Sequence, residues 1–383
     1  MSPLFWVGIC CCAASLAITL EVMTGMRRMT RLRDVAVPPA ESGPLVSIVI
    51  PACNEAATIE PALRSVLAMD YANREIIVVN DRSTDGTADV LARLAAEHPA
   101  LRILHITDLP AGWLGKSHAL QYGAERANGD YLLFTDADII MERTTLSRAM
   151  HHVRTHGLEH LSILFEHIGG SGLLNALFLD ICAALLLLYR PWLAKNPRSR
   201  QFMGVGAFNL VKTSAYRAIG RHRRIAMHPI DDIMLGKLLK RHGCRQDCLL
   251  GNGFVSVHWY ETVGQCINGL MKNSFALYNY RLSGMAAGVL FVFFLGVLPP
   301  WAAVFADNTA RLPFLAAVAL RLLSFVNGFR ETGGNPAYAA WSLATPYVAI
   351  YTSVTAAIRT IRHNGIDWRG THYPLDELKR SIV

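Results

Sequence analysis

Charged residues are scarce in this chain. Only 17% of its 383 residues are Asp, Glu, Lys or Arg, whereas 52% are hydrophobic and the mean hydropathy is +0.27. Average soluble domains carry about 25% charged residues, so the composition excludes a chain built of soluble domains alone. It is still too charged for a plain bundle of membrane helices. A soluble domain joined to membrane segments fits best.

Paired cysteines and long basic runs are also missing. The eight cysteines show no C-x-x-C spacing, and Cys244 and Cys248 in "CRQDC" have no second pair, which argues against structural zinc. Reduced thiols are the simpler interpretation. The net charge of +8 suits an anionic membrane surface or ligand. Without a basic run or an aromatic RNA-binding signature, we expect no nucleic-acid partner.

No basic residue precedes the first apolar run. Pro3 to Leu20 carries no charge and is long enough to cross roughly 30 Å of hydrocarbon. A cleaved signal peptide would need a basic segment before it, and the first Arg or Lys is Arg27. Arg27, Arg28, Arg31 and Arg33 follow the run and place its end in the cytosol. We therefore expect an uncleaved anchor over residues 1–24.

Four more apolar stretches follow, at 173–189, 285–306, 312–329 and 337–358. If all of the last three crossed the membrane, the basic tail at 359–383 would lie outside, against the positive-inside rule. One of them is therefore expected to be re-entrant or interfacial, and the sequence does not say which. The stretch at 173–189 carries Asp180, which makes insertion costly, so we expect an amphipathic helix lying on the membrane.

Between the anchors, residues 45–260 alternate short β-rich runs with helical patterns. The runs are "LVSIVIP", "EIIVVND", "LRILHI", "YLLFTDAD" and "HLSILFE". Such alternation predicts an α/β fold with a mostly parallel sheet buried on both faces. Ligands in these sheets bind beyond the carboxyl ends of the strands. Polar clusters follow three of the runs ("PACNE", "NDRSTDGT" and "TDAD"), so we expect them to share one site.

Two of these regions carry candidate binding residues. Asp81 lies at a strand end, too early to cap the next helix, and its carboxylate could accept a hydrogen bond from a base N–H or a ribose hydroxyl. Ser83 to Asp85 are read as the helix cap. Lys116 lies in "LPAGWLGKSHAL", which is not a phosphate loop because Pro110 stands where the pattern needs Gly. Lys116 is either a partner for a diphosphate or base, or a solvated surface residue.

Two aspartates one residue apart end an otherwise apolar strand. Asp136 and Asp138 would repel each other at a buried strand end and resist desolvation. A hard divalent cation removes that conflict, and Mg²⁺ or Mn²⁺ on one or two carboxylates takes its other ligands from phosphate oxygens. We therefore expect a metal held by Asp136 and Asp138, with His258 of "SVHWY" as a possible further ligand or, more simply, a half-buried structural His.

Another acidic pair opens a predicted helix, in "HPIDDIMLGKLLKRHG". Asp231 and Asp232 either stabilise the helix dipole or include a general base that removes a proton from an attacking hydroxyl. Asp232 is the candidate for that base.

Together these motifs resemble the family 2 glycosyltransferases, which are inverting enzymes with the GT-A fold. "VSIVIPACNE", "VVNDRSTDGT", "GKSHAL", "TDAD" and "IDDIMLGKLLKRHG" occur in that family's order and spacing. "LPAGWLGKSHAL" and the terminal "IDWRGTHY" resemble, more narrowly, the membrane-bound branch with hopene-associated, carotenoid (diaponeurosporenoate-type) and ceramide glycosyltransferases.

The resemblance implies roles for individual residues. Asp81 would contact the uracil or ribose, with Pro51, Asn54 and Glu55 nearby. Asp136 and Asp138 would hold nucleotide ribose and metal. Asp232 would be the base of the family's Glu-Asp motif, which here reads Asp231-Asp232 and leaves the role of the first acid open.

The Q-x-x-R-W motif of processive members is missing, since Gln265 is followed by "CINGL". We therefore expect transfer of a single sugar from a nucleotide-diphosphate sugar, which the resemblance implies to be a UDP-sugar, to a lipid acceptor at the membrane. The expected chain is a multi-pass protein of the inner membrane with a cytosolic GT-A domain at 45–260, an interfacial amphipathic helix at 261–283, a transmembrane or re-entrant region at 284–358 and a cytosolic tail. The alternatives are a processive polysaccharide synthase and an inactive membrane scaffold of the same fold.

Overall fold

The chain forms two compact units, each assembled from separate stretches of sequence. The computed structural model describes residues 2–37 and 43–380, apart from the side chain of Asn308. We call the units the sheet unit (Met29–Ile168, Tyr189–Trp259, Asp367–Val383) and the helical unit (Met1–Arg28, Gly169–Leu188, Tyr260–Ile366). The expected boundaries differ from this division. The stretch 169–188 leaves the 45–260 domain, while residues from 29 onward and the end of the tail join it.

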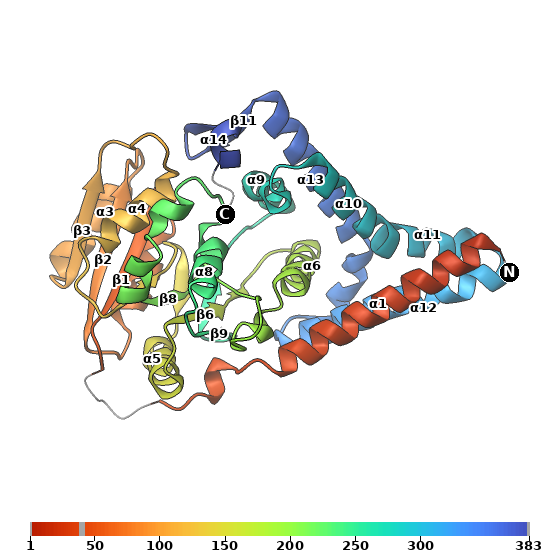
Figure 1. Cartoon of the computed structure of the whole chain (residues 1–383), viewed down its shortest axis with the longest axis horizontal. Coiled ribbons are helices and arrows are strands. Elements are labelled where there is room, and N and C mark those ends of the chain that lie inside the picture. Colours follow the sequence, from red (N-terminus) through yellow and green to blue (C-terminus); the bar gives the residue numbers. More distant parts are fainter. Residues whose placement is uncertain (1, 38–42, 381–383) are drawn as a thin grey trace. The chain divides into compact units, whose positions relative to one another are not determined.

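A seven-stranded sheet forms the core of the sheet unit (Figure 1). Its order is β3-β2-β1-β4-β8-β6-β9, and β8 alone among the described strands of this sheet runs antiparallel to its neighbours. The strands are β1 (Val46–Ala52), β2 (Arg74–Asp81), β3 (Leu101–Ile106), β4 (Tyr131–Phe134), β6 (His160–Leu164), β8 (Asn209–Lys212) and β9 (Gln246–Leu250).

The five predicted β-runs all form strands of this sheet. Residues of β1, β2, β4 and β6 are mostly buried, whereas the edge strand β3 is partly exposed. Ile48, Val49, Ile77 and Val78 are at most 1% exposed, as expected for the centre of a parallel sheet. The sequence pattern missed β8 and β9. These strands are short, and β9 opens with the buried polar residues Gln246 and Asp247, so neither shows a clear apolar run.

Helices cover the sheet and follow most of its strands. They are α2 (Ile59–Leu67), α3 (Thr87–Glu97), α4 (Gly115–Ala124), α5 (Thr145–His156), α7 (Thr213–Ala218) and α8 (Asp231–Arg241). Helix α4 packs directly over β1 and β2. A Cβ at Gly123 would lie 2.5 Å from Val49 Cγ1, so only glycine permits this close packing.

A small second sheet extends the fold beside β4. It has the order β5-β10-β7, with β5 (Ile139–Met141), β7 (Glu166–His167) and β10 (Val255–Val257). Val257 pairs with Ile139 in antiparallel register. Asp138 and His258 therefore lie next to each other, one residue beyond the paired ends.

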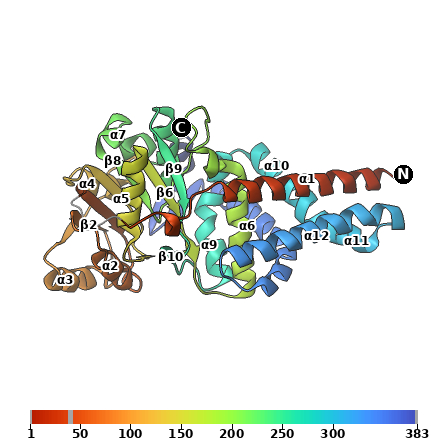
Figure 2. The ribbon, with the colours of Figure 1, turned by 90° about the horizontal axis from the view of Figure 1, so that it is seen from below.

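The helical unit contains long apolar helices. Four helical stretches among the described residues are long and apolar enough to cross a membrane, at Pro3–Arg27, Gly172–Leu193, Leu282–Phe305 and Thr309–Glu331. Helices α1 (Pro3–Arg27) and α12 (Asn308–Glu331) run side by side, as both Figure 1 and Figure 2 show. Their polar hydroxyls meet, with Thr19 Oγ1 2.9 Å from Ser324 Oγ.

Helix α6 (Gly172–Tyr189) differs from the expected amphipathic helix. Asn175 and Asp180 are its only strongly polar residues, and apolar side chains surround the rest of the helix, so it has no polar face. The Asp180 carboxylate also has hydrogen-bond partners. Arg321 Nη2 of α12 donates to its Oδ2 at 2.6 Å, and the Thr345 hydroxyl donates to the same oxygen at 2.6 Å. These contacts reduce the cost of placing the Asp180 carboxylate in a membrane. That cost was the reason for predicting an amphipathic helix.

The remaining helices of this unit are shorter or interrupted. Helix α9 (Val263–Ser274) begins with a capping box between Thr262 and Gln265. The apolar stretch expected at 285–306 is α10 (Leu282–Val292), a π-helical turn and α11 (Leu298–Phe305). The stretch expected at 337–358 is divided into a 3₁₀ helix, η6 (Pro336–Leu343), and α13 (Thr345–Arg362).

Candidate functional site

The predicted polar clusters meet at the carboxyl edge of the central sheet. Asn54 and Glu55 follow β1, Asp81 ends β2, and Asp136 follows β4 by two residues. Because β2, β1 and β4 are neighbours in this order, the three clusters lie side by side. This is the position at which parallel α/β sheets bind ligands.

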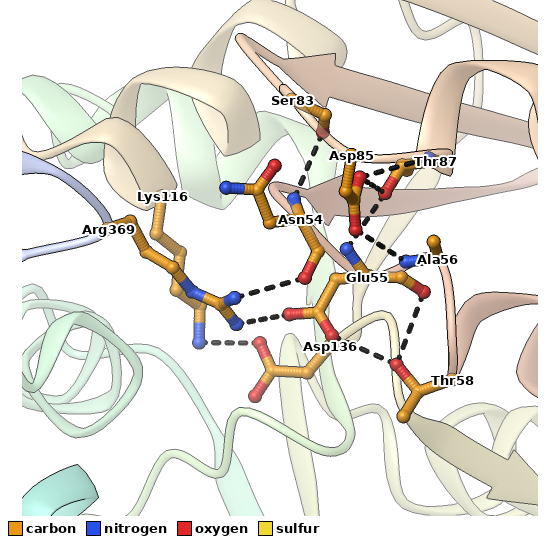
Figure 3. A network of polar contacts seen from close by, with 10 residues as sticks. All are labelled: Asn54, Glu55, Ala56, Thr58, Ser83, Asp85, Thr87, Lys116, Asp136 and Arg369. Carbon is orange, nitrogen blue, oxygen red and sulfur yellow. Dashed lines mark hydrogen bonds and ion pairs between the residues drawn. The ribbon is translucent and has the colours of Figure 1, made fainter.

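The loops after β1 and β2 hold each other in place (Figure 3). The Asn54 N–H donates to Ser83 Oγ at 3.0 Å, and Asn54 Oδ1 accepts from the Thr84 N–H at 2.8 Å. Asp85 accepts from the Thr87 N–H at 2.9 Å, in the first turn of α3. Asp85 therefore serves the helix start as expected, whereas Ser83 and Thr84 bind the β1 loop instead.

Asp81 is buried, with 3% of its surface exposed. Its carboxylate accepts two hydrogen bonds from the guanidinium of Arg82, at 2.7 and 3.0 Å. Arg82 has a positive φ of 55°. A Cβ at Gly115 would lie 2.5 Å from Asp81 Oδ2, so a glycine is needed where α4 begins against this carboxylate.

Lys116 and Asp136 form an ion pair at the centre of the site. Lys116 Nζ lies 2.6 Å from Asp136 Oδ1, as Figure 3 shows. Burial would lower the pKa of the Lys116 ammonium, but the carboxylates of Asp136, Asp231 and Asp232 together raise it above its ordinary value. The surface-lysine alternative is therefore excluded, since this ammonium lies among three acids.

Asp232 joins this centre across a glycine. A Cβ placed on Gly206 would lie 2.8 Å from Asp136 Oδ2, 3.3 Å from Asp232 Oδ2 and 3.3 Å from Lys116 Nζ. Asp136, Lys116 and Asp232 thus surround the Cα of Gly206. The residues Lys116, Asp136, Gly206, Asp231 and Asp232 line one small cavity.

Backbone donors orient the Asp232 carboxylate. Its Oδ2 accepts from the Gly206 N–H at 2.7 Å and its Oδ1 from the Ile233 N–H at 2.8 Å. Burial raises the pKa of Asp232, while the Lys116 ammonium opposes that rise. Asp231, the first residue of α8, is 3% exposed.

Asp138 lies in an acidic environment. Burial and the carboxylates of Asp136 and Glu55 raise the pKa of Asp138 to about 7. Crowded carboxylate oxygens of this kind fit a hard divalent cation. Within residues 2–37 and 43–380, no group of three His, Cys, Asp or Glu side chains is arranged to hold a metal. A cation that takes most of its ligands from a bound phosphate does not need such a group.

Two predicted residues lie less centrally. Pro51 is a half-buried member of β1, paired with Val79 of β2. His258 is exposed, and the strand register brings its backbone next to Asp138.

The sequence reasoning missed the C-terminal contribution. Arg369 pairs with Glu55 through Nη2 and donates from Nη1 to the Asn54 carbonyl at 3.2 Å (Figure 3). The Tyr373 hydroxyl accepts the Gly115 N–H at 3.2 Å. Both residues belong to "IDWRGTHY", a motif that the sequence singled out without assigning it a place in the site.

Comparison with known proteins agrees with this architecture. Residues 47–219 match Glycosyl transferase family 2. The chain is 26% identical over 235 residues to 4,4'-diaponeurosporenoate glycosyltransferase of Staphylococcus haemolyticus, covering 56% of this chain and 57% of the relative. It is 34% identical over 98 residues to poly-beta-1,6-N-acetyl-D-glucosamine synthase of Staphylococcus aureus, covering 26% of this chain and 23% of the relative. This chain therefore spans less than two thirds of either relative.

A solved structure shares the fold over nearly the whole chain. The mannosyltransferase PcManGT from Pyrobaculum calidifontis, in complex with GDP-Man and Mn²⁺, superposes with a TM-score of 0.55 at 20% identity, over 92% of this chain and 99% of that one. The mostly parallel sheet is thus a GT-A fold. The similarity to Glycosyl transferase family 2 is limited to residues 47–219, less than half of the chain.

Proposed function

We propose that this chain is a membrane-bound, inverting glycosyltransferase that moves one sugar from a nucleotide-diphosphate sugar to a lipid acceptor. The observation that carries the proposal is the convergence of Lys116, Asp136 and Asp232 around Gly206. These groups come from α4, the end of β4 and the start of α8. An acid proposed to bind a cation, an ammonium proposed to bind the diphosphate and a candidate base thus line one small cavity.

Asp232 is the proposed general base. The acceptor hydroxyl oxygen attacks the anomeric carbon, its proton passes to the Asp232 carboxylate, and the bond to the diphosphate breaks with its electron pair on the leaving oxygen. Two backbone N–H groups orient the carboxylate. Its raised pKa makes it a better proton acceptor than an ordinary exposed Asp.

Lys116, Asp136 and Asp138 are the groups proposed to meet the diphosphate. The Lys116 ammonium stays protonated and can stabilise charge on the leaving phosphate oxygens. Asp136 and Asp138, with His258 as a possible further ligand, would hold Mg²⁺ or Mn²⁺, which when bound neutralises diphosphate charge. The mannosyltransferase of similar fold is described in complex with Mn²⁺ and GDP-Man, which supports a cation and a nucleotide-sugar donor here.

The nucleoside is expected at the ends of β1 and β2. Asp81, Asn54, Glu55 and Pro51 surround that position, and Asp81 offers acceptor oxygens to a base N–H or ribose hydroxyl. A uridine nucleotide remains the proposal from the sequence resemblance. The mannosyltransferase carries a guanosine nucleotide, so both bases belong in the test.

A lipid acceptor and an inner-membrane location are proposed on two grounds. The name of the Staphylococcus haemolyticus relative states a diaponeurosporenoate substrate. The helical unit also supplies apolar helices long enough to cross a membrane.

Connectivity limits how the chain can cross that membrane. Trp259 and Asp367 both belong to the sheet unit, so the segment between them must cross an even number of times. If the two long stretches Leu282–Phe305 and Thr309–Glu331 both cross, the number of crossings is even. Helix α13 then lies on the same side of the membrane as Trp259. Ile168 and Tyr189 also share the sheet unit, so α6 must begin and end on one side. We infer three crossings, by α1 and these two stretches, with the sheet unit in the cytosol.

A processive polysaccharide synthase is the second candidate. The 34% identity to poly-beta-1,6-N-acetyl-D-glucosamine synthase favours it, although only over 98 residues. The missing Q-x-x-R-W motif favours transfer of a single sugar. An inactive scaffold is disfavoured because acids are present in all three clusters of the site.

The test incubates membranes containing the protein with radiolabelled UDP-sugars and GDP-mannose and identifies the labelled product by mass spectrometry. We expect one lipid carrying one sugar. A polymer ladder would support the synthase instead, and no labelled product with any donor, together with no metal-dependent nucleotide binding, would support the scaffold.

Asp232→Asn is the matched catalytic variant in this assay. It should abolish transfer and leave nucleotide affinity nearly unchanged, because the amide cannot accept the proton. Asp89→Asn is the control, since Asp89 is also an acid in the first turn of a helix, α3, but is exposed and lies outside the site. Near-normal turnover in Asp232→Asn would refute the base assignment.

A further inference from the structure

The C-terminal turn touches each part of the proposed nucleoside pocket. Arg369 and Gly370, with φ of 50° and 76°, connect β11 (Gly365–Trp368) to β12 (Thr371–Pro374). Arg369 contacts the loop after β1, and Thr371 Oγ1 accepts from Arg82 Nη1 at 3.4 Å, beside Asp81. Tyr373 accepts the N–H of Gly115, where α4 begins. Five consecutive residues thus reach three separate elements of the site.

Three non-glycine residues at the pocket have positive φ angles, as do five others elsewhere among the described residues. Asn54, Arg82 and Arg369 have φ of 56°, 55° and 50°. Asn tolerates this region, whereas other residues with a side chain are strained there and keep the conformation only where the surroundings require it. A turn alone would be satisfied better by Gly than by Arg at position 369. What an arginine adds at position 369 has to be found in the contacts of its side chain.

The contacts of Arg369 indicate what that contribution is. Its guanidinium binds the Glu55 carboxylate and the Asn54 carbonyl at the same time, using two nitrogens. Glu55 is the better buried partner, with a side chain 19% exposed against 44% for Arg369. The fork therefore fixes both the backbone and the side chain of the loop that would face the donor's nucleoside.

We propose that Arg369 is a donor-positioning residue. It holds Asn54 and Glu55 in the conformation that receives the nucleoside, so that binding pays less for ordering the loop. Because Arg369 follows the membrane segments in the chain, the C-terminal segment completes the donor site from beyond them. This inference rests on the proposed function, since it presumes that a nucleotide binds at the ends of β1 and β2.

Arg369→Gly separates positioning from folding. Glycine suits the left-handed backbone, so the melting temperature should not fall. The affinity of the full-length protein in detergent for UDP or GDP with MnCl₂, measured by calorimetry, should fall by about tenfold or more. The nucleotide affinity of Arg369→Lys should lie between those of the wild type and Arg369→Gly, because an ammonium restores the charge but not the contact through two nitrogens. In sugar-transfer assays the donor KM should rise more than kcat falls.

Arg221→Gly is the matched control. Arg221 also has a positive φ, of 60°, pairs with a glutamate, Glu125, at 3.0 Å and has a side chain 44% exposed, the same as Arg369. Its variant should bind nucleotide like the wild type. Unchanged affinity in Arg369→Gly, an equal loss in Arg221→Gly, or a lowered melting temperature of Arg369→Gly with full affinity in Arg369→Lys would each overturn the proposal. If the wild type binds neither nucleotide, the proposed function fails, and this inference with it.

Discussion

Gly206 shows how a single missing Cβ shapes the site. Its backbone N–H holds Asp232, its carbonyl accepts the Asp136 N–H at 3.1 Å, and its bare Cα leaves room for the Lys116 ammonium. No sequence motif marked this residue. Its importance follows only from three elements meeting over it.

We predict that Gly206→Ala lowers sugar transfer by roughly 100-fold, because displacing reacting groups by about 1 Å costs that much. The added methyl would lie 2.8 Å from Asp136 Oδ2 and force the acid or the loop to move. Gly264→Ala, in α9, is the control, since its nearest neighbour would be Thr262 Oγ1 at 3.9 Å. The measurement is the initial rate of sugar transfer on membranes normalised for protein amount. Equal rates for Gly206→Ala and Gly264→Ala would contradict the proposal that the active centre lies around Gly206.

The acidic members of the site and Lys116 could be predicted at the residue scale, whereas the two arginines could not. Asp81, Asp136 and Asp232 follow apolar strands or open a helix, where an acid needs an explanation. Arg82 and Arg369 lie in turns, where an arginine ordinarily indicates solvent. Their roles depend on partners from other segments, Glu55 for Arg369 above all.

At the scale of elements, one polar cluster joins the helices of the helical unit. Asp180 of α6, Arg321 of α12 and Thr345 of α13 bind one another, and Arg321 Nε also donates to the Ser342 carbonyl at 3.0 Å. Charged residues in an apolar helical region are retained only when they are paired in this way. The sequence showed Asp180 as costly in an apolar helix but not its partner, because Arg321 lies 141 positions away.

We predict that Asp180→Asn or Arg321→Met alone lowers the unfolding free energy by about 2 kcal/mol, less than a fully buried pair would because both side chains keep some exposure. The double variant Asp180→Leu with Arg321→Met should cost less than the sum of the single variants, since no charge is left unpaired. Denaturant unfolding in detergent micelles measures this. Additive losses would mean that the two residues act independently.

At the scale of the whole molecule, chain connectivity supports the proposed membrane topology at points where hydropathy leaves it open. Helix α6 is apolar, yet the chain segments on both sides of it, ending at Ile168 and beginning at Tyr189, belong to the sheet unit. Apolar length alone cannot distinguish a crossing helix from one that returns.

We predict that cysteines introduced at Ser171 and Arg198, which flank α6, react with a membrane-impermeant maleimide from the same side, whereas one at Thr309 reacts only from the other. Inside-out and right-side-out vesicles separate the two sides, and the unaltered chain with its own eight cysteines gives the background. Opposite labelling of 171 and 198 would mean that α6 crosses the bilayer and divides the sheet unit.

The sequence by itself determined the local features: the apolar strands, the N-terminal helix, and the acids at strand and helix ends. Each of these features depends on residues close together in the sequence, because strand burial and helix dipoles act over a few positions. The tertiary structure alone decided the partners, which are Arg82 for Asp81, Arg369 for Glu55 and Arg321 for Asp180. It also decided which stretches of sequence belong to the sheet unit and which to the helical unit. Ion pairs between distant residues form only when separate segments fold together, so no local sequence pattern predicts them.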